Sequence, residues 1–357
     1  MTGPIDQDTI RETYALIRNR VRRTPILTTS AGDLGLDRPV IMKLENTQHA
    51  GSFKTRGVFA NLASRAVPAA GVAAASGGNH GAAVAYGAAH LGIAAKIFVP
   101  ETSSPAKIAR IRDLGADLHV EGEGYADAAA LCSDYVAETG AMEIHPYDSP
   151  ATIAGQGTLA LEWQEQALGL DTVLIAVGGG GLIAGAASWF GDRVQVIGVE
   201  PTGAATLHTA LAAGEPVDVP VHSIAADSLG ARRAGSLVFD IAEESIDDVL
   251  LVEDDDIRDA QLALWRDFRI AVEPGAATAL AALTCGAYRP SFGERVGVLV
   301  CGGNVDLAEL AALNAEQPPL RDRALPPLEG SALASLADGI TPNPDASAAS
   351  SAAHAEL

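Results

Sequence analysis

The sequence predicts an α/β protein built on parallel sheets with crossover helices. Two observations lead to this prediction. Short apolar runs alternate along the chain with longer amphipathic stretches, and most of the short runs are apolar without interruption. Uninterrupted apolar runs are typical of strands that are covered on both faces. The alternation itself is typical of parallel sheets, because each parallel strand needs a crossover connection to the next.

The expected strands are the short apolar runs at residues 40–44, 72–75, 96–99, 118–120, 172–177, 194–199, 249–252 and 296–301. The amphipathic helices expected between them cover residues 10–21, 104–114, 125–138, 152–167 and 254–268. The last 41 or so residues, 317–357, are rich in proline, alanine and serine and lack a sustained period. We expect this tail to be mostly disordered.

The composition is that of a globular protein and excludes several function classes. Of 357 residues, 48% are hydrophobic and 19% are charged, and the formal net charge is -21. This acidic balance argues against nucleic acid or a membrane surface as a partner. We find no apolar run that could span a bilayer and no pattern of a secretory signal. Three widely spaced cysteines form neither a disulfide framework nor a zinc motif, so we expect a cytoplasmic protein.

Lys54 is the lysine best placed for chemistry. It is one of four lysines in the chain, and it follows a predicted strand and loop at the point where a helix would begin. A helix N-terminus disfavours the charged ammonium, so the amine gives up its proton more readily. A neutral amine is what covalent chemistry with an aldehyde requires. On spacing alone, an ordinary solvated lysine is the alternative interpretation.

Two glycine-rich loops follow predicted strands and open predicted helices. Residues 76–81, Ser-Gly-Gly-Asn-His-Gly, offer small side chains and free N–H groups that suit a carboxylate. A turn capped by Asn79 is the alternative there. Residues 178–182 contain four consecutive glycines and then a leucine. A tight turn rarely needs four glycines, so this second loop predicts a phosphate site.

The second loop also fits a dinucleotide-binding fingerprint. Gly179, Gly181 and Ala184 have the spacing Gly-x-Gly-x-x-Ala. Glu200 ends the next predicted strand, where an acid that binds a ribose is expected. A nicotinamide-dependent dehydrogenase is therefore an alternative, although it leaves Lys54 and the first loop unexplained.

Cys301 ends the last predicted strand and begins the segment Cys-Gly-Gly-Asn. Ligands of open α/β sheets bind beyond the carboxyl ends of the strands, so this position suits a cofactor. A small buried thiol is the alternative.

Taken in order, these segments resemble the fold-type-II family of pyridoxal phosphate enzymes, and within it the threonine/serine dehydratases and serine racemases. The resemblance spans roughly residues 10–313 and rests on segments 52–57, 76–81, 154–158, 178–182, 199–201, 272–274 and 301–304. It implies two open parallel-sheet α/β domains, as in the tryptophan synthase β chain, with the cofactor in the cleft between them. Residues 1–62 and 145–316 would form the large domain and residues 63–144 the small one.

The resemblance also implies roles for individual residues. Lys54 would bind pyridoxal 5'-phosphate covalently and remove the α-proton of the substrate. Phe53 would lie against the cofactor ring, Asn79 would bind its hydroxyl, and Cys301 would face its pyridine nitrogen. The phosphate would be held by Gly178, Gly179, Gly180, Gly181 and Leu182. The substrate carboxylate would lie near Ser76, Gly77 and His80.

No metal ligand is predicted. The cation site of the family joins an acid at Glu200 to a carboxylate six residues further on. Here the second position is Thr206, which carries no charge and weakens any site for a divalent or monovalent cation. Ser228 also departs from the family, since many relatives have glycine at this position near the cofactor.

The activity implied by the resemblance is the dehydration and deamination of a small hydroxy amino acid, L-threonine and/or L-serine, to a 2-oxo acid and ammonia. Within the family, a 3-hydroxyaspartate dehydratase and a serine racemase are alternatives. Racemases carry a serine where this chain has Gly77, and glycine has no proton to donate. His80 is the one evident basic residue for a side-chain carboxylate, which favours neutral substrates. The family suggests a homodimer.

Overall fold

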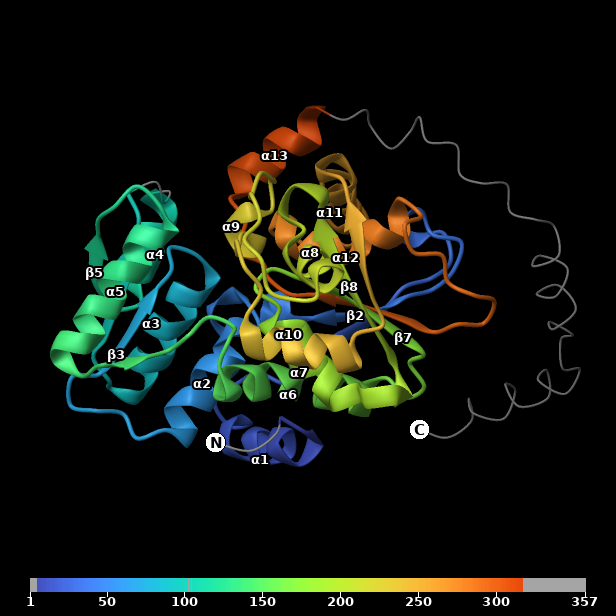
Figure 1. The fold of residues 1–357 in the computed structure, drawn as a ribbon. Helices are drawn as coiled ribbons and strands as arrows, with labels where there is room; N and C mark the ends of the chain where they lie inside the picture. The colour runs from blue at the N-terminus through green and yellow to red at the C-terminus, as the bar shows by residue number, and fades with distance from the viewer. Residues whose placement is uncertain (1–4, 102, 104, 317–357) are drawn as a thin grey trace, which may run out of the picture. The chain divides into compact units, whose positions relative to one another are not determined.

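Two sheets organise residues 5–101, 103 and 105–316, the part of the chain that the computed structural model describes (Figure 1). The larger sheet has six strands in the order β1-β2-β10-β7-β8-β9. Its strands are β1 Ile26–Thr28, β2 Ile41–Leu44, β7 Thr172–Ala176, β8 Gln195–Pro201, β9 Asp248–Val252 and β10 Val296–Val300. Neighbouring strands are parallel except β1 and β2, which pair antiparallel at one edge.

The smaller sheet has four strands in the order β5-β4-β3-β6, and it is parallel throughout. Its strands are β3 Val72–Ala75, β4 Ala95–Val99, β5 Asp117–Val120 and β6 Met142–Glu143. The helices between them are α3 Asn79–Leu91, α4 Pro105–Asp113 and α5 Tyr125–Thr139. The residues of β3 are all buried, as expected for a strand with helices on both faces.

The other helices precede, cross over or follow the larger sheet (Figure 1). They are α1 Gln7–Ile17, α2 Lys54–Ser64, α6 Pro150–Gln166, α7 Gly181–Phe190, α8 Thr206–Ala213, α9 Ala226–Leu229, α10 Ser236–Ser245, α11 Asp254–Phe268, α12 Pro274–Thr284 and α13 Leu307–Glu316. The core lies between these helices and the sheet, where β7 and β10 are buried along their whole length. Helix α6 is buried from Ala151 to Trp163 and packs against α2 and α7.

Local signals explain where several helices begin. Ser149 caps α6 by accepting a hydrogen bond from the Thr152 N–H, and Pro150 occupies the first helical turn. Helix α11 starts in the acidic run after Glu253, and the Asp256 carboxylate accepts a hydrogen bond from the Glu253 N–H at 3.1 Å. Negative charge at a helix N-terminus is favourable, so the acidic run serves the helix start.

The predicted α/β class with parallel sheets is confirmed, and each predicted strand is present with ends shifted by at most two residues. The predicted first helix, residues 10–21, begins three residues too late. Helix α1 begins at Gln7, because Asp6 caps it by accepting a hydrogen bond from the Thr9 N–H at 2.9 Å. The antiparallel β1 was not predicted, since three residues give no usable pattern. Helix α12 was also missed, because a fully buried helix has no amphipathic period.

Two further sequence-based predictions concern the chain outside the sheets. No helix of the described residues is long and apolar enough to cross a membrane. The expected disordered tail, residues 317–357, lies outside the described residues. The division into a large and a small domain stays a prediction.

Candidate active site

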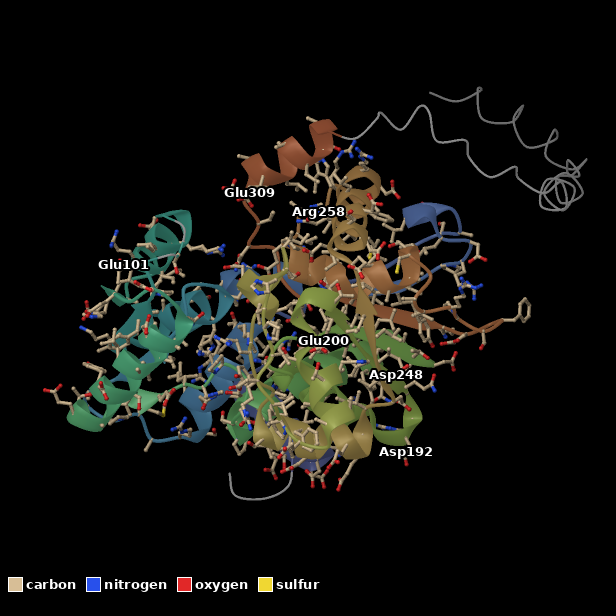
Figure 2. All side chains as sticks on the ribbon, turned by 45° about the horizontal axis from the view of Figure 1, so that its top comes forward. Glu101, Asp192, Glu200, Asp248, Arg258 and Glu309 are labelled. Atoms are coloured by element: carbon tan, nitrogen blue, oxygen red, sulfur yellow. The ribbon has the colours of Figure 1, made fainter. Side chains whose placement is uncertain are left out.

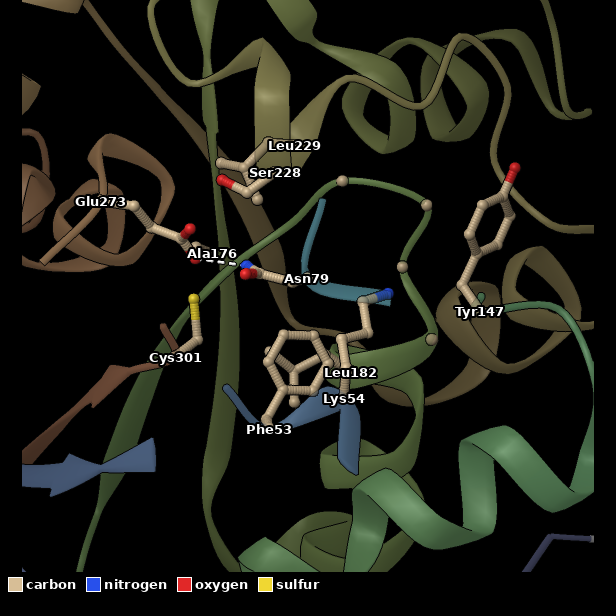
Figure 3. Close-up of a pocket in the computed structure, with 14 residues that line it drawn as sticks. Phe53, Lys54, Asn79, Tyr147, Ala176, Leu182, Ser228, Leu229, Glu273 and Cys301 are labelled. Atoms are coloured by element: carbon tan, nitrogen blue, oxygen red, sulfur yellow. Dashed lines mark hydrogen bonds between the residues drawn. The ribbon is translucent and has the colours of Figure 1, made fainter. Parts of the chain in front are cut away.

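One pocket gathers residues from segments that lie far apart in the sequence (Figure 3). It is lined by Phe53, Lys54, Asn79, Tyr147, Ala176, Gly178, Gly179, Gly180, Gly181, Leu182, Ser228, Leu229, Glu273 and Cys301. Every residue predicted to bind the cofactor is in this set. The pocket lies beyond the carboxyl ends of β2, β7 and β10, which parallel pairing brings to the same edge of the larger sheet.

Lys54 is the first residue of α2, as its position after a strand and loop predicted. Its Nζ donates a hydrogen bond to the Pro146 carbonyl oxygen at 2.7 Å and lies 5.1 Å from the centre of the Phe53 ring. Removal of water from the amine lowers the pKa of Lys54 to about 8, although Cys301 and Glu273 act in the opposite direction. A substantial fraction of the amine is therefore neutral near physiological pH.

The glycine loop between β7 and α7 is packed too tightly for side chains. A Cβ at Gly179 would lie 2.3 Å from the Tyr147 ring. Gly180 has φ +86°, and a Cβ there would lie 2.3 Å from the Val238 side chain. Helix α7 begins at Gly181 and has no side-chain cap, so its first N–H groups are available to a ligand. This arrangement suits a phosphate group.

Cys301 is buried directly after β10, and its Sγ lies 3.8 Å from the Gly275 carbonyl oxygen. Burial raises the pKa of the Cys301 thiol far above its ordinary value. The side chain is therefore a neutral thiol, which places no negative charge in this part of the pocket.

Glu273, just before α12, is a pocket residue that sequence reasoning left without a role. Its Oε1 accepts a hydrogen bond from the Asn79 Nδ2 at 2.5 Å, and its Oε2 is buried without a partner among the described residues. Burial raises the pKa of Glu273 to about 7, and the Asn79 bond acts in the opposite direction. The segment 272–274 entered the sequence analysis only as part of the family resemblance, which did not indicate that the acid faces a pocket. Ser228 lines the pocket, in agreement with its expected position near the cofactor, and Tyr147 lines it without having been predicted to do so.

Comparison with known proteins identifies the family. Residues 17–302 match the family model described as "Pyridoxal-phosphate dependent enzyme". The chain belongs to this family. It is 38% identical over 311 residues to phenylserine dehydratase from Ralstonia pickettii, which covers 86% of this chain and 95% of that protein. It is 36% identical over 309 residues to L-threonine ammonia-lyase from Geobacter sulfurreducens, covering 85% and 77%.

Solved structures agree with this assignment. The structure of maize serine racemase matches with a TM-score of 0.81 and 34% identity, covering 86% of this chain and 96% of the racemase. The chain is thus a fold-type-II enzyme of the threonine/serine dehydratase-like group, and the cofactor of its family is pyridoxal phosphate.

The pocket of this pyridoxal phosphate enzyme fits its cofactor at both ends. The glycine loop provides a cradle that side chains would fill, and the uncapped start of α7 offers N–H groups that suit a phosphate. Lys54 offers an amine with a lowered pKa for the aldehyde. Asn79 supplies a polar side chain between these ends, and Phe53 an apolar ring.

The three predicted substrate residues lie beside the pocket and are not in its lining. The Ser76 Oγ accepts from the Gly78 N–H at 3.2 Å, and a Cβ at Gly77 would lie 2.3 Å from the Ser103 Oγ. The His80 Nε2 lies 2.7 Å from the Ile144 carbonyl oxygen. Burial lowers the pKa of His80 to about 3, so His80 is neutral and offers no positive charge to a carboxylate. Their contact with substrate stays a prediction.

The interpretation of Asn79 as a helix cap is wrong. Gly78 occupies the N-cap position of α3, and Asn79 is the first helical residue. The Asn79 side chain bonds instead to Glu273 and Asn304, which belong to distant parts of the chain.

Glu200 is fully buried, whereas Glu101, Asp192, Asp248 and Glu309 carry negative charge at the surface (Figure 2). Its two carboxylate oxygens accept hydrogen bonds from the Leu207 N–H at 2.8 Å and the His208 N–H at 2.9 Å, at the start of α8. Thr206 is turned to the Ala231 carbonyl oxygen, to which it donates at 2.7 Å.

These contacts bear on two sequence-based predictions. Both carboxylate oxygens of Glu200 are hydrogen-bonded to N–H groups at the start of α8, and Glu200 does not line the pocket. It therefore does not hold a ribose there. Together with the family assignment, this removes the nicotinamide-dependent alternative. No group of three His, Cys, Asp or Glu residues in the described ranges could hold a metal ion.

Proposed function

We propose that this enzyme is a pyridoxal phosphate-dependent ammonia-lyase that dehydrates and deaminates a small hydroxy amino acid, L-threonine and/or L-serine. The observation that carries the proposal is that Lys54 shares one pocket with the tetraglycine cradle and a neutral Cys301. The named relatives, a phenylserine dehydratase and an L-threonine ammonia-lyase, support elimination from β-hydroxy amino acids.

Several residues of the pocket have a definable task. Gly178–Leu182 and the start of α7 would hold the cofactor phosphate, and Phe53 would pack against its ring. The Lys54 Nζ, with a pKa of about 8, takes the proton from the α-carbon of the substrate. When bound, pyridoxal phosphate supplies the electron sink for the pair left on that carbon.

Neutral Cys301 favours elimination over return of the proton. A neutral thiol beside the pyridine nitrogen would not strongly stabilise its protonated form, so Cys301 would keep the electron sink modest and would favour loss of the β-hydroxyl. The Cα–H and Cβ–O bonds break, a Cα=Cβ double bond forms, and the departing hydroxyl takes up one proton and leaves as water, so that the proton removed from Cα is accounted for. The released enamine then takes up water and gives the 2-oxo acid and ammonia.

The pocket also supports a choice among the alternatives within the family. Racemisation needs a proton donor on the opposite face, and Gly77 supplies none. A 3-hydroxyaspartate would bring a second carboxylate, and Lys54 is the one cationic side chain among the described residues that line the pocket. Since His80 is neutral, a neutral substrate side chain fits better.

The proposal is tested by a substrate panel scored for ammonia and 2-oxo acid. The panel contains L-serine, L-threonine, L-phenylserine and 3-hydroxyaspartate, and we expect the first two to be turned over fastest. Borohydride reduction followed by peptide mass spectrometry should place the cofactor label on Lys54. Lys54→Ala is the test variant, and Lys96→Ala is its matched control. The amine of Lys96 pairs with Asp117 at 2.8 Å and lies outside the pocket. A Lys54→Ala protein that forms product at the parental rate rules the proposal out.

We further propose a cytoplasmic homodimer with the two-domain division given above. The family resemblance suggests the dimer. The three cysteines, Cys132, Cys285 and Cys301, are all free, as a reducing compartment would keep them. Light scattering of the purified holoenzyme measures the oligomeric state.

A further inference from the structure

Three side chains from distant segments form a hydrogen-bonded row, and two of them, Asn79 and Glu273, line the pocket. The Asn304 Nδ2 donates to the Ala50 carbonyl oxygen at 3.0 Å and to the Asn79 Oδ1 at 2.5 Å. The Asn79 Nδ2 donates in turn to the Glu273 Oε1 at 2.5 Å. We call Asn304, Asn79 and Glu273 the amide row. Figure 3 shows its bond between Asn79 and Glu273 beside Cys301 and Phe53.

The direction of the amide row is fixed at one end by the backbone. A carbonyl oxygen can only accept, so the Asn304 atom that faces Ala50 must be its nitrogen. The same nitrogen faces Asn79, which must therefore present its oxygen to Asn304. The Asn79 nitrogen is left to face Glu273, whose carboxylate accepts. The two ends of an amide look alike in shape, so these partners are what distinguish them.

This direction decides what Asn79 offers to a ligand. The Asn79 Oδ1 is occupied by Asn304, and one of the two hydrogens on Nδ2 is given to Glu273. The second hydrogen on Nδ2 has no acceptor among the described residues, and Asn79 lines the pocket. An N–H is thus the group that remains available to an oxygen of the cofactor ring. A reversed amide would present a carbonyl oxygen, which repels an ionised ring oxygen.

We propose that Asn304 and Glu273 are positioning residues, which hold the Asn79 amide so that its N–H, and not its carbonyl oxygen, meets the ring oxygen of pyridoxal phosphate. The inference rests on the proposed placement of the cofactor in this pocket. It assigns a task to two residues that touch Asn79 from 225 and 194 positions away in the sequence.

The sharpest test reverses the direction of the hydrogen bonds in the amide row. Asn304→Asp replaces the group that donates to Asn79 by an acceptor, and Glu273→Gln provides a group that can donate to Asn79 at the other end. In the double variant Asn304→Asp with Glu273→Gln, the Asn79 amide can turn over, donate to the new carboxylate at position 304 and accept from the new amide at position 273, so that each member again has a partner. The Ala50 carbonyl keeps a donor, because Arg110 Nη2 also bonds to it at 3.0 Å.

Two readouts separate positioning from simple stability. One is the apoenzyme melting temperature. The other is cofactor binding, measured as the dissociation constant of pyridoxal phosphate and as the pH midpoint of the absorbance of the bound cofactor. We expect Asn304→Asp to lower the melting temperature and to weaken cofactor binding about tenfold, the scale of one hydrogen bond to a charged group. The double variant should recover part of the melting temperature, since an oxygen at position 304 still faces the Ala50 carbonyl, while the affinity and the pH midpoint stay altered.

The control is Asn314→Asp, the same chemical change at an amide that accepts from the Arg266 Nε at 3.0 Å on α13. It should leave cofactor affinity and pH midpoint at the parental values. Recovery of melting temperature, affinity and midpoint together in the double variant would overturn the inference, as would parental cofactor binding in Asn304→Asp. A parent chain that binds no pyridoxal phosphate overturns the proposed function along with it.

Discussion

The amine of Lys54 is hydrogen-bonded to the backbone carbonyl of Pro146 at 2.7 Å. This bond connects the start of α2 to the segment that leads into α6, and the next residue, Tyr147, packs over the glycine cradle. One short segment therefore touches both the amine and the phosphate end of the pocket. The predictions below test the amine, the cradle, the anchoring of this segment and the charges buried behind it.

The lowered pKa of Lys54 predicts how cofactor incorporation depends on pH. The neutral amine reacts, so the rate at which apoenzyme takes up pyridoxal phosphate should rise about tenfold per pH unit and level off above a pKa of about 8. Stopped-flow absorbance over pH 6 to about 10 measures this profile. Lys54→Arg should form no covalent product at any pH. A rate that still climbs at about pH 10 would show an unperturbed lysine.

Gly179→Ala should weaken binding of the cofactor phosphate. The new methyl group would lie 2.3 Å from the Tyr147 ring, so either the loop or the ring must move. We expect a loss of about tenfold or more in affinity for pyridoxal phosphate, measured by equilibrium dialysis of the apoenzyme.

Two variants accompany Gly179→Ala. Gly124→Ala adds a methyl group where nothing lies within 4 Å, and it should leave cofactor affinity unchanged. Gly179→Ala combined with Tyr147→Ala removes the clashing ring and should regain part of the affinity. Equal affinity of the Gly179→Ala and parental proteins would show that the loop does not hold the phosphate.

Asp148 anchors the segment that carries Pro146 and Tyr147. Its carboxylate accepts hydrogen bonds from the N–H groups of Ser236 and Leu237, both at 3.0 Å, at the start of α10. Asp148→Ala should cost about 1 to 2 kcal/mol of unfolding free energy, as loss of a helix cap does, and should also weaken cofactor binding. Chemical denaturation and cofactor titration measure the two effects.

Asp8→Ala is the control for the anchor, because Asp8 is an exposed residue of α1 that pairs with Arg11. It should change unfolding free energy by less than about 1 kcal/mol and leave cofactor binding alone. If Asp148→Ala also leaves unfolding free energy and cofactor binding nearly unchanged, the hydrogen bonds of Asp148 do not contribute to holding this segment at the pocket.

Arg56, two residues after Lys54, forms ion pairs with two buried carboxylates. Its guanidinium bonds to Glu45 and Glu162, both at 2.7 Å, and all three side chains are buried. Arg56→Ala leaves uncompensated buried charge and should cost about 3 to 5 kcal/mol of unfolding free energy. Arg258→Ala, which breaks the exposed pair with Asp255, is the matched control and should cost less than about 1 kcal/mol.

The same cluster predicts acid sensitivity. Burial raises the pKa of Glu45, but the charge and hydrogen bonds of Arg56 outweigh burial and leave that pKa below 4.5. A carboxylate with a lowered pKa in the folded state stabilises the fold above its ordinary pKa, and this stability is lost as the pH falls below about 4.5. Melting temperatures from pH 7 to about 3 should show the loss. If a Glu45→Gln protein lost melting temperature at low pH by the same amount as the parent, this account would be contradicted.

Local sequence determined a large part of this protein. The uninterrupted apolar runs specify the strands, because a strand covered on both faces has to be apolar throughout. The tetraglycine run indicates the phosphate cradle, since a loop with no side chains can approach a ligand closely. The position of Lys54 after a strand and loop specifies the first residue of a helix. All of these signals lie within a few neighbouring residues.

Tertiary structure alone decided which polar groups meet. A cap was one of two interpretations of Asn79 in the sequence, yet its side chain bonds to residues 194 and 225 positions away. Glu200 looked like a ribose ligand, yet it binds the N–H groups of α8. A polar side chain takes whichever partner the packing of strands and helices brings within about 3 Å. The choice of partner is therefore absent from local sequence patterns and appears only when distant segments pack together.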